Sequence, residues 1–466
     1  MSATDRPRVL ILGPTFDTVT GGGITLTNLF QGWPAERLAM ASFDPCLVEP
    51  APAAYRYRLG SAERRWIAPL RFAGAMDIAE GGPVGAGAAP AGAGPPTAAP
   101  GVARTGVAAG DSDGRAAGGG LRPVAKKAFH GMVGLLGSDE YLRPVRASGA
   151  LVSWAKAFQP DLLYTQLGTW GITRLALDLQ AALGVPTALH MMDDWPEVLY
   201  RHGLLGRRLS RRLDRDLRTF IGDASACIAI SDAMAREYET RYGREWTYFH
   251  NPVEPERWRT ADAAGAPGAR GDFTLVYSGR IGPGIESSVL DICRVVAGLR
   301  RQGRRVRLEI YSIHFDRTSD PRFAAFEGVG LHGAIPDANV AATLGAADIL
   351  VLPFDFHGDA AAFARLSFPT KAPAYEATGV PILVYAPAGH AVAADAAARG
   401  WGYVVGEPDL GVLAAAITRL MDDGGLRSEL SRRALADVAE RHEAGVVRER
   451  FAATLAAAAR PGSGPS

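Results

Sequence analysis

Residues Ala347–Pro387 read ADILVLPFDFHGDAAAFARLSFPTKAPAYEATGVPILVYAP, and this stretch decides the fold class. It contains two short runs, Asp348–Pro353 and Pro381–Tyr385, that are apolar at nearly every position. Strands that are covered on both faces of a parallel sheet have this composition. A longer segment with a helical pattern separates the two runs. Alternation of buried strands with helices predicts a doubly wound α/β architecture.

The same alternation continues in both directions along the chain. Further strand candidates in the second half are Phe273–Ser278, Val306–Tyr311 and Gly402–Val405, and those in the first half are Arg8–Leu12, Asp161–Thr165, Pro186–His190 and Ala226–Ile230. The pattern restarts near Phe273, after the proline-bearing stretch Asn251–Arg270. We therefore expect an α/β protein with two Rossmann-like, doubly wound parallel-sheet domains, residues 1–255 and residues 256–442.

One segment of the first domain departs from this pattern. Residues Gly81–Leu121 consist mainly of glycine, alanine and proline, with almost no large apolar side chains. Such a segment cannot bury enough surface to offset the loss of its chain entropy. We therefore predict that residues 81–121 form a disordered insert.

Composition excludes several classes of protein. The 466 residues carry a formal net charge of +1, so the chain as a whole does not attract nucleic acid. The three cysteines, Cys46, Cys227 and Cys293, lie far apart and are typical of buried thiols in a reducing compartment. No stretch approaches the roughly 20 apolar residues that span a bilayer. We expect a cytoplasmic protein, or one at the inner membrane face.

A basic segment, Arg201–Arg218, leaves room for peripheral membrane contact. Arginines alternate with leucines along it, as in helices that lie on an anionic membrane surface. A solvated helix face would show the same pattern.

Two places in the first half could carry chemistry. Gly21, Gly22 and Gly23 lie in TVTGGGITLTNL, between the first strand and a helix, where bare amides attract anions and where a tight turn is the alternative. His190, Asp193 and Asp194 lie in LHMMDDWPE, residues Leu189–Glu197, at the end of a predicted strand. In open α/β sheets, ligands bind at the carboxyl ends of strands. These side chains could accept a proton or stabilise positive charge on a sugar carbon, while either aspartate could instead cap a helix.

The second half offers a complementary set of polar residues. Arg280 lies in the loop VYSGRIGPGI with Ser278 and Gly279, where a guanidinium suits a diphosphate. In RLSFPTKAPAYEATGVP, Ser367, Thr370 and Lys371 could hold phosphate, and Glu376 could accept bonds from ribose hydroxyls.

These pieces together resemble the family called glycosyl transferases group 1, which has the GT-B fold. The resemblance rests on ISDAMAREYETRYG at Ile230–Gly243, HNPVE at His250–Glu254, YSGRIG at Tyr277–Gly282 and the Ala347–Pro387 stretch. It covers nearly the whole chain outside the insert. It implies two domains that face each other across a cleft, with the nucleotide-sugar donor bound mainly by the second domain. A glycan, lipid-linked or small-molecule acceptor would be held by the first.

The same resemblance assigns roles. Arg280 and Lys371 would neutralise the departing diphosphate, with Ser367 and Thr370 near its phosphates and Gly21–Gly23 facing the same cleft. His190, Asp193 or Asp194 would stand near the reacting carbon or the acceptor hydroxyl. The family implies retention of anomeric configuration, no metal and no other cofactor. It also implies that residues 443–466 supply a helix that returns to the first domain, followed by a flexible tail.

The sequence departs from the family pattern near the donor site. Ile285 occupies the neighbourhood of a family lysine, and Ala374 and Leu366 stand where the family carries glutamates. Tyr375 could substitute in ribose recognition. These departures keep open an alternative, a catalytically inactive GT-B partner or scaffold protein. A metal-dependent transferase would use an Asp-x-Asp such as Asp214–Asp216, which does not follow a predicted strand.

Overall fold

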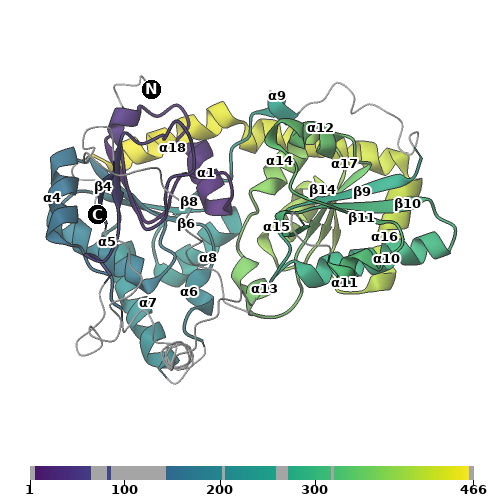
Figure 1. The fold of residues 1–466 in the computed structure, drawn as a ribbon, viewed down its shortest axis with the longest axis horizontal. Helices are drawn as coiled ribbons and strands as arrows, with labels where there is room; N and C mark the ends of the chain where they lie inside the picture. Colours follow the sequence, from purple (N-terminus) through teal and green to yellow (C-terminus); the bar gives the residue numbers. More distant parts are fainter. Residues whose placement is uncertain are drawn as a thin grey trace, which may run out of the picture.

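The computed structural model describes residues 6–64, 81–84, 143–201, 205–258, 271–315 and 320–460. These residues form two α/β units that lie side by side (Figure 1). In the described part of the chain, the first sheet has the order β4-β3-β2-β1-β5-β6-β7-β8 and the second has the order β11-β10-β9-β12-β13-β14. All neighbouring strands are parallel except the pair β3 and β4.

The strands are short. Those of the first sheet are β1 (Val9–Leu12), β2 (Leu38–Ser42), β3 (Tyr55–Arg58), β4 (Gly82–Val84), β5 (Leu162–Thr165), β6 (Thr187–Met191), β7 (Ala226–Ala229) and β8 (Thr247–Tyr248). Those of the second sheet are β9 (Phe273–Ser278), β10 (Val306–Tyr311), β11 (Val329–His332), β12 (Ile349–Pro353), β13 (Ile382–Tyr385) and β14 (Gly402–Val405).

Helices connect the strands of both units. In the first unit they are α1 (Gly21–Leu29), α4 (Gly149–Phe158), α5 (Trp170–Leu183), α6 (Trp195–Val198), α7 (Gly206–Asp223) and α8 (Asp232–Tyr242). The later ones are α9 (Pro255–Trp258), α10 (Glu286–Arg301), α11 (Pro321–Ala324), α12 (Val340–Gly345), α13 (Asp359–Ala364), α14 (Lys371–Thr378), α15 (Ala391–Arg399), α16 (Leu410–Asp422), α17 (Gly424–Asp437) and α18 (Ala444–Ala458). The π-helical turn η6 (Val438–His442) precedes α18.

All nine strands expected from apolar runs are confirmed, to within a residue at each end. The sequence missed β2, β3, β8 and β11. Their sequences, LAMAS, YRYR, TY and VGLH, are short and lack a continuous β-branched or aromatic run. Pairing with an existing neighbour, which local composition does not encode, forms such strands.

The predicted insert starts too early. Gly82–Val84 forms β4, an antiparallel edge strand whose Pro83 lies opposite Tyr57. An edge strand tolerates proline because one side of its backbone needs no partner, so a Gly/Pro-rich tripeptide can still join a sheet. The rest of the predicted insert, residues 85–121, lies outside the described residues.

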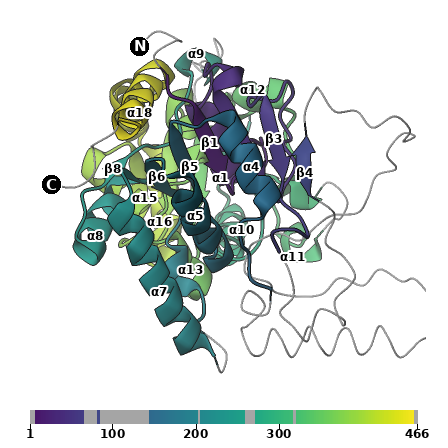
Figure 2. The same ribbon diagram turned by 90° about the vertical axis from the view of Figure 1, so that its left-hand side faces the viewer.

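Both faces of the first sheet are buried, as its apolar strands require. Leu10 and Leu12 of β1 belong to a core shared with α4, α5 and α7. Val9 and Ile11 point the other way, into a core shared with α1 and α18. All four side chains are fully buried. Figure 2 shows α4, α5 and α7 together on the side of the sheet away from α18.

The chain crosses between the units twice. After β8 it enters the second unit near α9, and after η6 it returns as α18, which contacts α1, β6 and β7 (Figure 1). The two crossing segments pair with each other, because Val253 N–H donates to the His442 carbonyl at 2.9 Å and Ala444 N–H donates to the Val253 carbonyl at 3.0 Å. Phe451 of α18 packs edge-on against Phe30, with ring centroids 5.2 Å apart.

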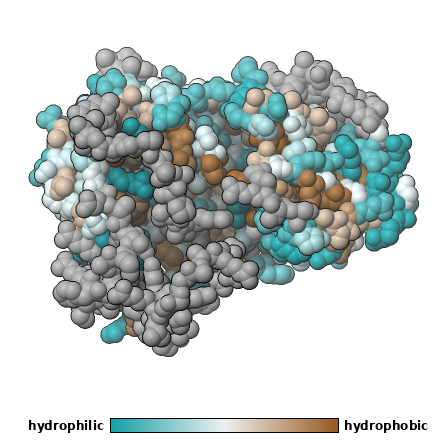
Figure 3. Space-filling model, viewed as in Figure 1, coloured by the Kyte–Doolittle hydropathy of each residue, from teal (hydrophilic) through white to brown (hydrophobic). Residues whose placement is uncertain are grey.

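The units also touch beside the crossing segments. Ser231 at the start of α8 donates from Oγ to the Leu366 carbonyl at 2.7 Å, and His250 stacks on Phe368 with centroids 3.9 Å apart. On the face drawn in Figure 3, hydrophilic residues dominate the outer end of the second unit, and hydrophobic residues gather nearer the middle of the molecule. Among the described helices, none has the length and apolarity needed to cross a bilayer.

Candidate active site

Two cations come together at the carboxyl end of β9. Lys371 is the first residue of α14, and its Nζ donates to the Ser278 carbonyl at 3.1 Å. Arg280 lies two residues further along the same loop, exposed, with Nη1 donating to the Pro283 carbonyl at 3.1 Å. Burial lowers the pKa of Lys371 to about 7, and the positive charge of Arg280 adds to this effect. The structure therefore brings the guanidinium and the amine to one side of the second unit.

Tyr277 contacts the Lys371 amine and the backbone of Arg280. The Lys371 Nζ lies 4.6 Å from the centroid of the Tyr277 ring, a cation–π arrangement, and 3.5 Å from its hydroxyl. The same hydroxyl donates to the Arg280 carbonyl at 2.6 Å. A glycine fits at position 279 because a Cβ there would collide with the Lys371 Nζ. Tyr277 belongs to the motif YSGRIG, but nothing in that motif predicts these contacts.

Tyr375 is tied to the protein backbone. Its hydroxyl accepts from the Ser278 N–H at 3.0 Å and donates to the Ser278 carbonyl at 3.1 Å. The side chain is buried, and burial raises its pKa above the ordinary value. This placement gives Tyr375 a supporting position behind the loop and does not favour the expected contact with a ribose.

Ser367 and Thr370 lie where the two units meet. Ser367 Oγ donates to Asp193 Oδ1 at 2.6 Å, which links the segment before α14 to the end of β6. The Thr370 carbonyl accepts from Asn251 Nδ2 at 3.1 Å. The Thr370 methyl group lies 3.7 Å from the position that a Cβ on Gly21 would take. The glycine turn of the first unit therefore faces the phosphate-binding segment predicted in the second.

The glycine turn is the N-terminus of α1. Thr20 caps the helix by accepting from the Gly23 N–H at 3.0 Å. Asp17 accepts from the Val19 and Thr20 N–H groups at 2.8 and 2.6 Å, and a Cβ on Gly23 would collide with its carboxylate. Asp17, which sequence reasoning missed, lies beside this helix end. Gly21 and Gly22 remain the parts of the turn that face the other unit and Gln166.

His190 is fully buried on β6. Its Nδ1 lies 2.7 Å from the Tyr164 hydroxyl, and Gln166 Nε2 donates to that same hydroxyl at 3.2 Å. Gln166 in turn lies beside Gly22. Burial lowers the pKa of His190 to about 3, so the imidazole is neutral at neutral pH. His190 therefore reaches the glycine turn through Tyr164 and Gln166.

The two neighbouring aspartates have different surroundings. Asp193 is half-buried and faces Ser367 and Arg280, and burial raises its pKa against the opposing effect of these two partners. Asp194 is fully buried and accepts from Arg241 at 2.8 and 3.1 Å and from the Tyr238 hydroxyl at 2.9 Å. Asp194 is the N-cap residue of α6, but its side chain makes no capping bond. The structure therefore places Asp193 near Ser367 and Arg280, and Asp194 in the packing of α8.

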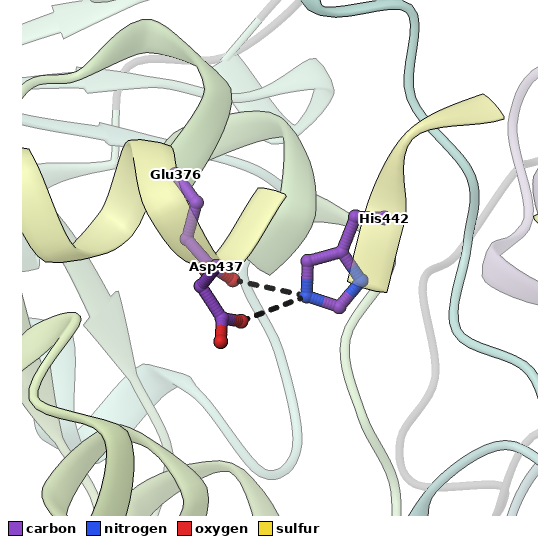
Figure 4. Close-up of side chains that lie close together, drawn as sticks. All are labelled: Glu376, Asp437 and His442. Carbon is purple, nitrogen blue, oxygen red and sulfur yellow. Dashed lines mark ion pairs between the residues drawn. The ribbon is translucent and has the colours of Figure 1, made fainter. Parts of the chain in front are cut away.

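Glu376 points into a buried cluster with Asp437 and His442 (Figure 4). His442 Nε2 lies 3.6 Å from Glu376 Oε1 and 3.3 Å from Asp437 Oδ2. Burial, together with the neighbouring Asp437 carboxylate, raises the pKa of Glu376 well above its ordinary value. A ribose cannot reach this fully buried side chain, so its placement does not favour the expected donor contact.

The same cluster is the group of described residues whose ligand atoms are close enough for a metal ion, all within 4.8 Å of one another. However, Asp437 already bonds to Arg441 at 2.5 Å and to Arg399. Two guanidiniums neutralise the carboxylate and would repel a cation. We therefore interpret the cluster as part of the packing between α14 and the crossing segment.

Comparisons with known proteins agree with this architecture. Residues 107–257 match the model of a family described as Glycosyltransferase Family 4, a stretch that ends at the crossing between the units. A search of curated proteins gave no match.

Among solved structures, HepE of Anabaena in complex with UDP-glucose aligns with a TM-score of 0.53 at 13% identity, over 96% of this chain and 98% of that one. Sucrose-phosphate synthase of Thermosynechococcus elongatus aligns with a TM-score of 0.58 at 14% identity, over 95% and 97%. WaaG, a glycosyltransferase involved in lipopolysaccharide biosynthesis, aligns with a TM-score of 0.54 at 12% identity, over 95% and 98%. The expected fold is confirmed: the chain has the GT-B fold.

Proposed function

We propose that the protein is a glycosyltransferase that moves a sugar from a nucleotide-diphosphate donor to a glycan, lipid-linked or small-molecule acceptor. The observation that carries this proposal is the pairing of Arg280 and Lys371 at the carboxyl end of β9, opposite the glycine turn of the first unit. Ligands of open α/β sheets bind at this end of the strands. The Glycosyltransferase Family 4 match and the UDP-glucose complex of HepE support a sugar nucleotide as the donor.

The main requirement of the reaction is fixed positive charge that stabilises the leaving diphosphate. Breaking the bond between sugar and diphosphate develops positive charge on the sugar carbon and negative charge on the leaving group. Arg280 and Lys371 would stabilise the departing diphosphate, with Ser367 and Thr370 beside its phosphates. In this proposal the two cations supply the positive charge that a metal ion would otherwise provide. Turnover should therefore persist in EDTA. The proposed reaction retains the anomeric configuration.

The first unit contributes the other side of the reaction. Asp193 is the carboxylate that faces Arg280, so we assign to it the role near the sugar carbon or the acceptor hydroxyl. His190 supports the glycine turn through Tyr164, and Asp194 holds α8 in place. Both would therefore act indirectly.

A thermal-shift panel tests the donor site. ADP, GDP, UDP, CDP and dTDP should be compared on wild type, Arg280→Ala and Arg432→Ala, the last being an exposed arginine of α17 paired with Glu429. At about 100 times its dissociation constant, the preferred nucleotide stabilises the fold by about 2.7 kcal/mol, which raises Tm by several degrees. The rise should disappear in Arg280→Ala and persist in Arg432→Ala. A flat response across the panel would favour the alternative of a catalytically inactive GT-B partner.

The acceptor side includes a surface that suits an anionic membrane. The apolar side of α7 packs in the core, through Leu209, Leu213, Leu217, Phe220 and Ile221. Its outer side is exposed and carries Arg207, Arg208, Arg211, Arg212, Arg215 and Arg218. Because the apolar side is already occupied, we propose that this helix contacts lipid headgroups by charge alone.

Sedimentation with vesicles checks this contact. Vesicles that contain phosphatidylglycerol should bind the protein at low salt, at about 1 kcal/mol per arginine, and vesicles of phosphatidylcholine should not. The triple change Arg207→Gln, Arg208→Gln and Arg211→Gln should weaken binding at least tenfold. Arg218→Gln is the control, since Arg218 is already paired with Asp214 at 3.0 Å. Equal binding to both vesicle types would exclude a role for α7 in membrane contact.

A further inference from the structure

The Lys371 amine lies among uncharged groups. Its Nζ lies 3.1 Å from the Ser278 carbonyl oxygen, 3.5 Å from the Tyr277 hydroxyl and 4.6 Å from the centroid of the Tyr277 ring. Among the residues that the structure describes, no carboxylate comes within ion-pair distance of this amine. The ammonium form of this half-buried lysine therefore lacks the counter-charge that usually stabilises a lysine away from solvent.

The charged and titratable groups around the amine do not change this balance. Arg280, from the loop after β9, has the same sign of charge. Asp193, from the first unit, is engaged by Ser367 and faces Arg280. Tyr277 and Tyr375 keep their protons, because burial raises the pKa of both phenols. The pKa of Lys371, lowered to about 7, agrees with this geometry.

We propose that a diphosphate binds at this site together with one proton, which the Lys371 amine takes up from solvent as the phosphates arrive. This inference rests on the proposed donor site. The phosphates supply the missing negative charge and offset the repulsion from Arg280, so the ammonium becomes the stable form in the complex. The only bond that forms is the third N–H bond of the amine, and the buffer provides the proton.

Proton uptake makes binding depend on pH. The pKa of the amine is higher in the complex than in the free protein, so protons favour binding. Above the free pKa of about 7, affinity should fall by about tenfold per pH unit until the pKa of the complex is reached. A lysine with an ordinary pKa would give no such fall between pH 7 and 9.

Titration calorimetry at pH 8 measures the uptake directly. The ligand is the nucleoside diphosphate that gives the largest thermal shift, and its terminal phosphate, with a pKa of about 6, is already ionised at this pH. The heat of binding is measured in HEPES, Tris and tricine, whose ionisation enthalpies differ. The slope of heat against ionisation enthalpy should correspond to about 0.9 protons taken up per diphosphate bound, the neutral fraction at pH 8 of an amine whose pKa is about 7.

Two variants assign the proton to Lys371. Lys371→Met should bind at least tenfold more weakly with no uptake, and Lys156→Met, which changes an exposed lysine of α4, should keep the wild-type slope. Clear binding by wild type without uptake would overturn the inference and leave the proposed function intact. Undiminished uptake in Lys371→Met would also overturn it, because the proton would then go to another group. If no nucleoside diphosphate bound, both the inference and the proposed function would fall.

Discussion

Replacing Lys371 with methionine should lower kcat by about 100- to 1,000-fold, which corresponds to about 2.7–4 kcal/mol of transition-state stabilisation lost with one preorganised donor. The free energy of unfolding should change by less than about 1 kcal/mol, because the amine has no carboxylate partner and its burial beside Arg280 already opposes the charged form. Methionine keeps most of the apolar volume of the stem. The change at position 371 should therefore lower turnover strongly and leave stability nearly unchanged.

The measurement pairs single-turnover kinetics with urea unfolding on the same preparations. Lys156→Met is the matched control, since it makes the same chemical change on the exposed face of α4 and should leave both quantities as in wild type. If Lys371→Met lost stability in proportion to turnover, the amine would be a structural group and the proposed leaving-group role would be wrong.

Asp194→Ala should have the opposite effect, a large loss of stability with little change in kcat. The fully buried Asp194 carboxylate joins the end of β6 to α8 through Arg241 and the Tyr238 hydroxyl. Removing it leaves a half-buried guanidinium without its main partner. Loss of one member of a buried pair destabilises a fold by about 3–5 kcal/mol. Urea unfolding should show this loss, while the molecules that remain folded should turn over at close to the wild-type rate.

Asp232→Ala is the control for this second variant. Asp232 pairs with Arg236 within α8, and both side chains are exposed, so its removal should cost less than about 0.5 kcal/mol. A large loss of kcat in Asp194→Ala with unchanged stability would contradict the structural role. It would return Asp194 to the group of catalytic candidates.

The strands that are buried on both faces could be predicted because their composition carries the signal. Val9–Leu12 and Ile382–Tyr385 are apolar at every position and fully buried. The edge strands β4, β8 and β11 could not be predicted, because their formation depends on a neighbouring strand. The start of the insert was misplaced for the same reason, since Gly82–Val84 has no intrinsic strand preference.

The candidate site shows the same division. The residue types and motifs identified Arg280, Ser367 and Lys371 one at a time, from the chemistry that a diphosphate requires. Only the tertiary structure shows that they lie close together, because the Lys371 amine and its carbonyl partner Ser278 are 93 residues apart in the sequence. Tyr277, which contacts the Lys371 amine and the Arg280 backbone carbonyl, gave no local signal beyond its place in a strand.

Adjacent residues show most clearly what a sequence leaves undecided. Asp193 and Asp194 are chemically identical, yet one faces Ser367 and the other is enclosed by Arg241 and Tyr238. The sequence by itself determined the two α/β units and the cationic character of the second, because hydrophobic pattern and residue chemistry are local properties. Only the tertiary structure decided which side chains meet, because the surroundings that set a pKa or occupy a carboxylate come from segments distant along the chain.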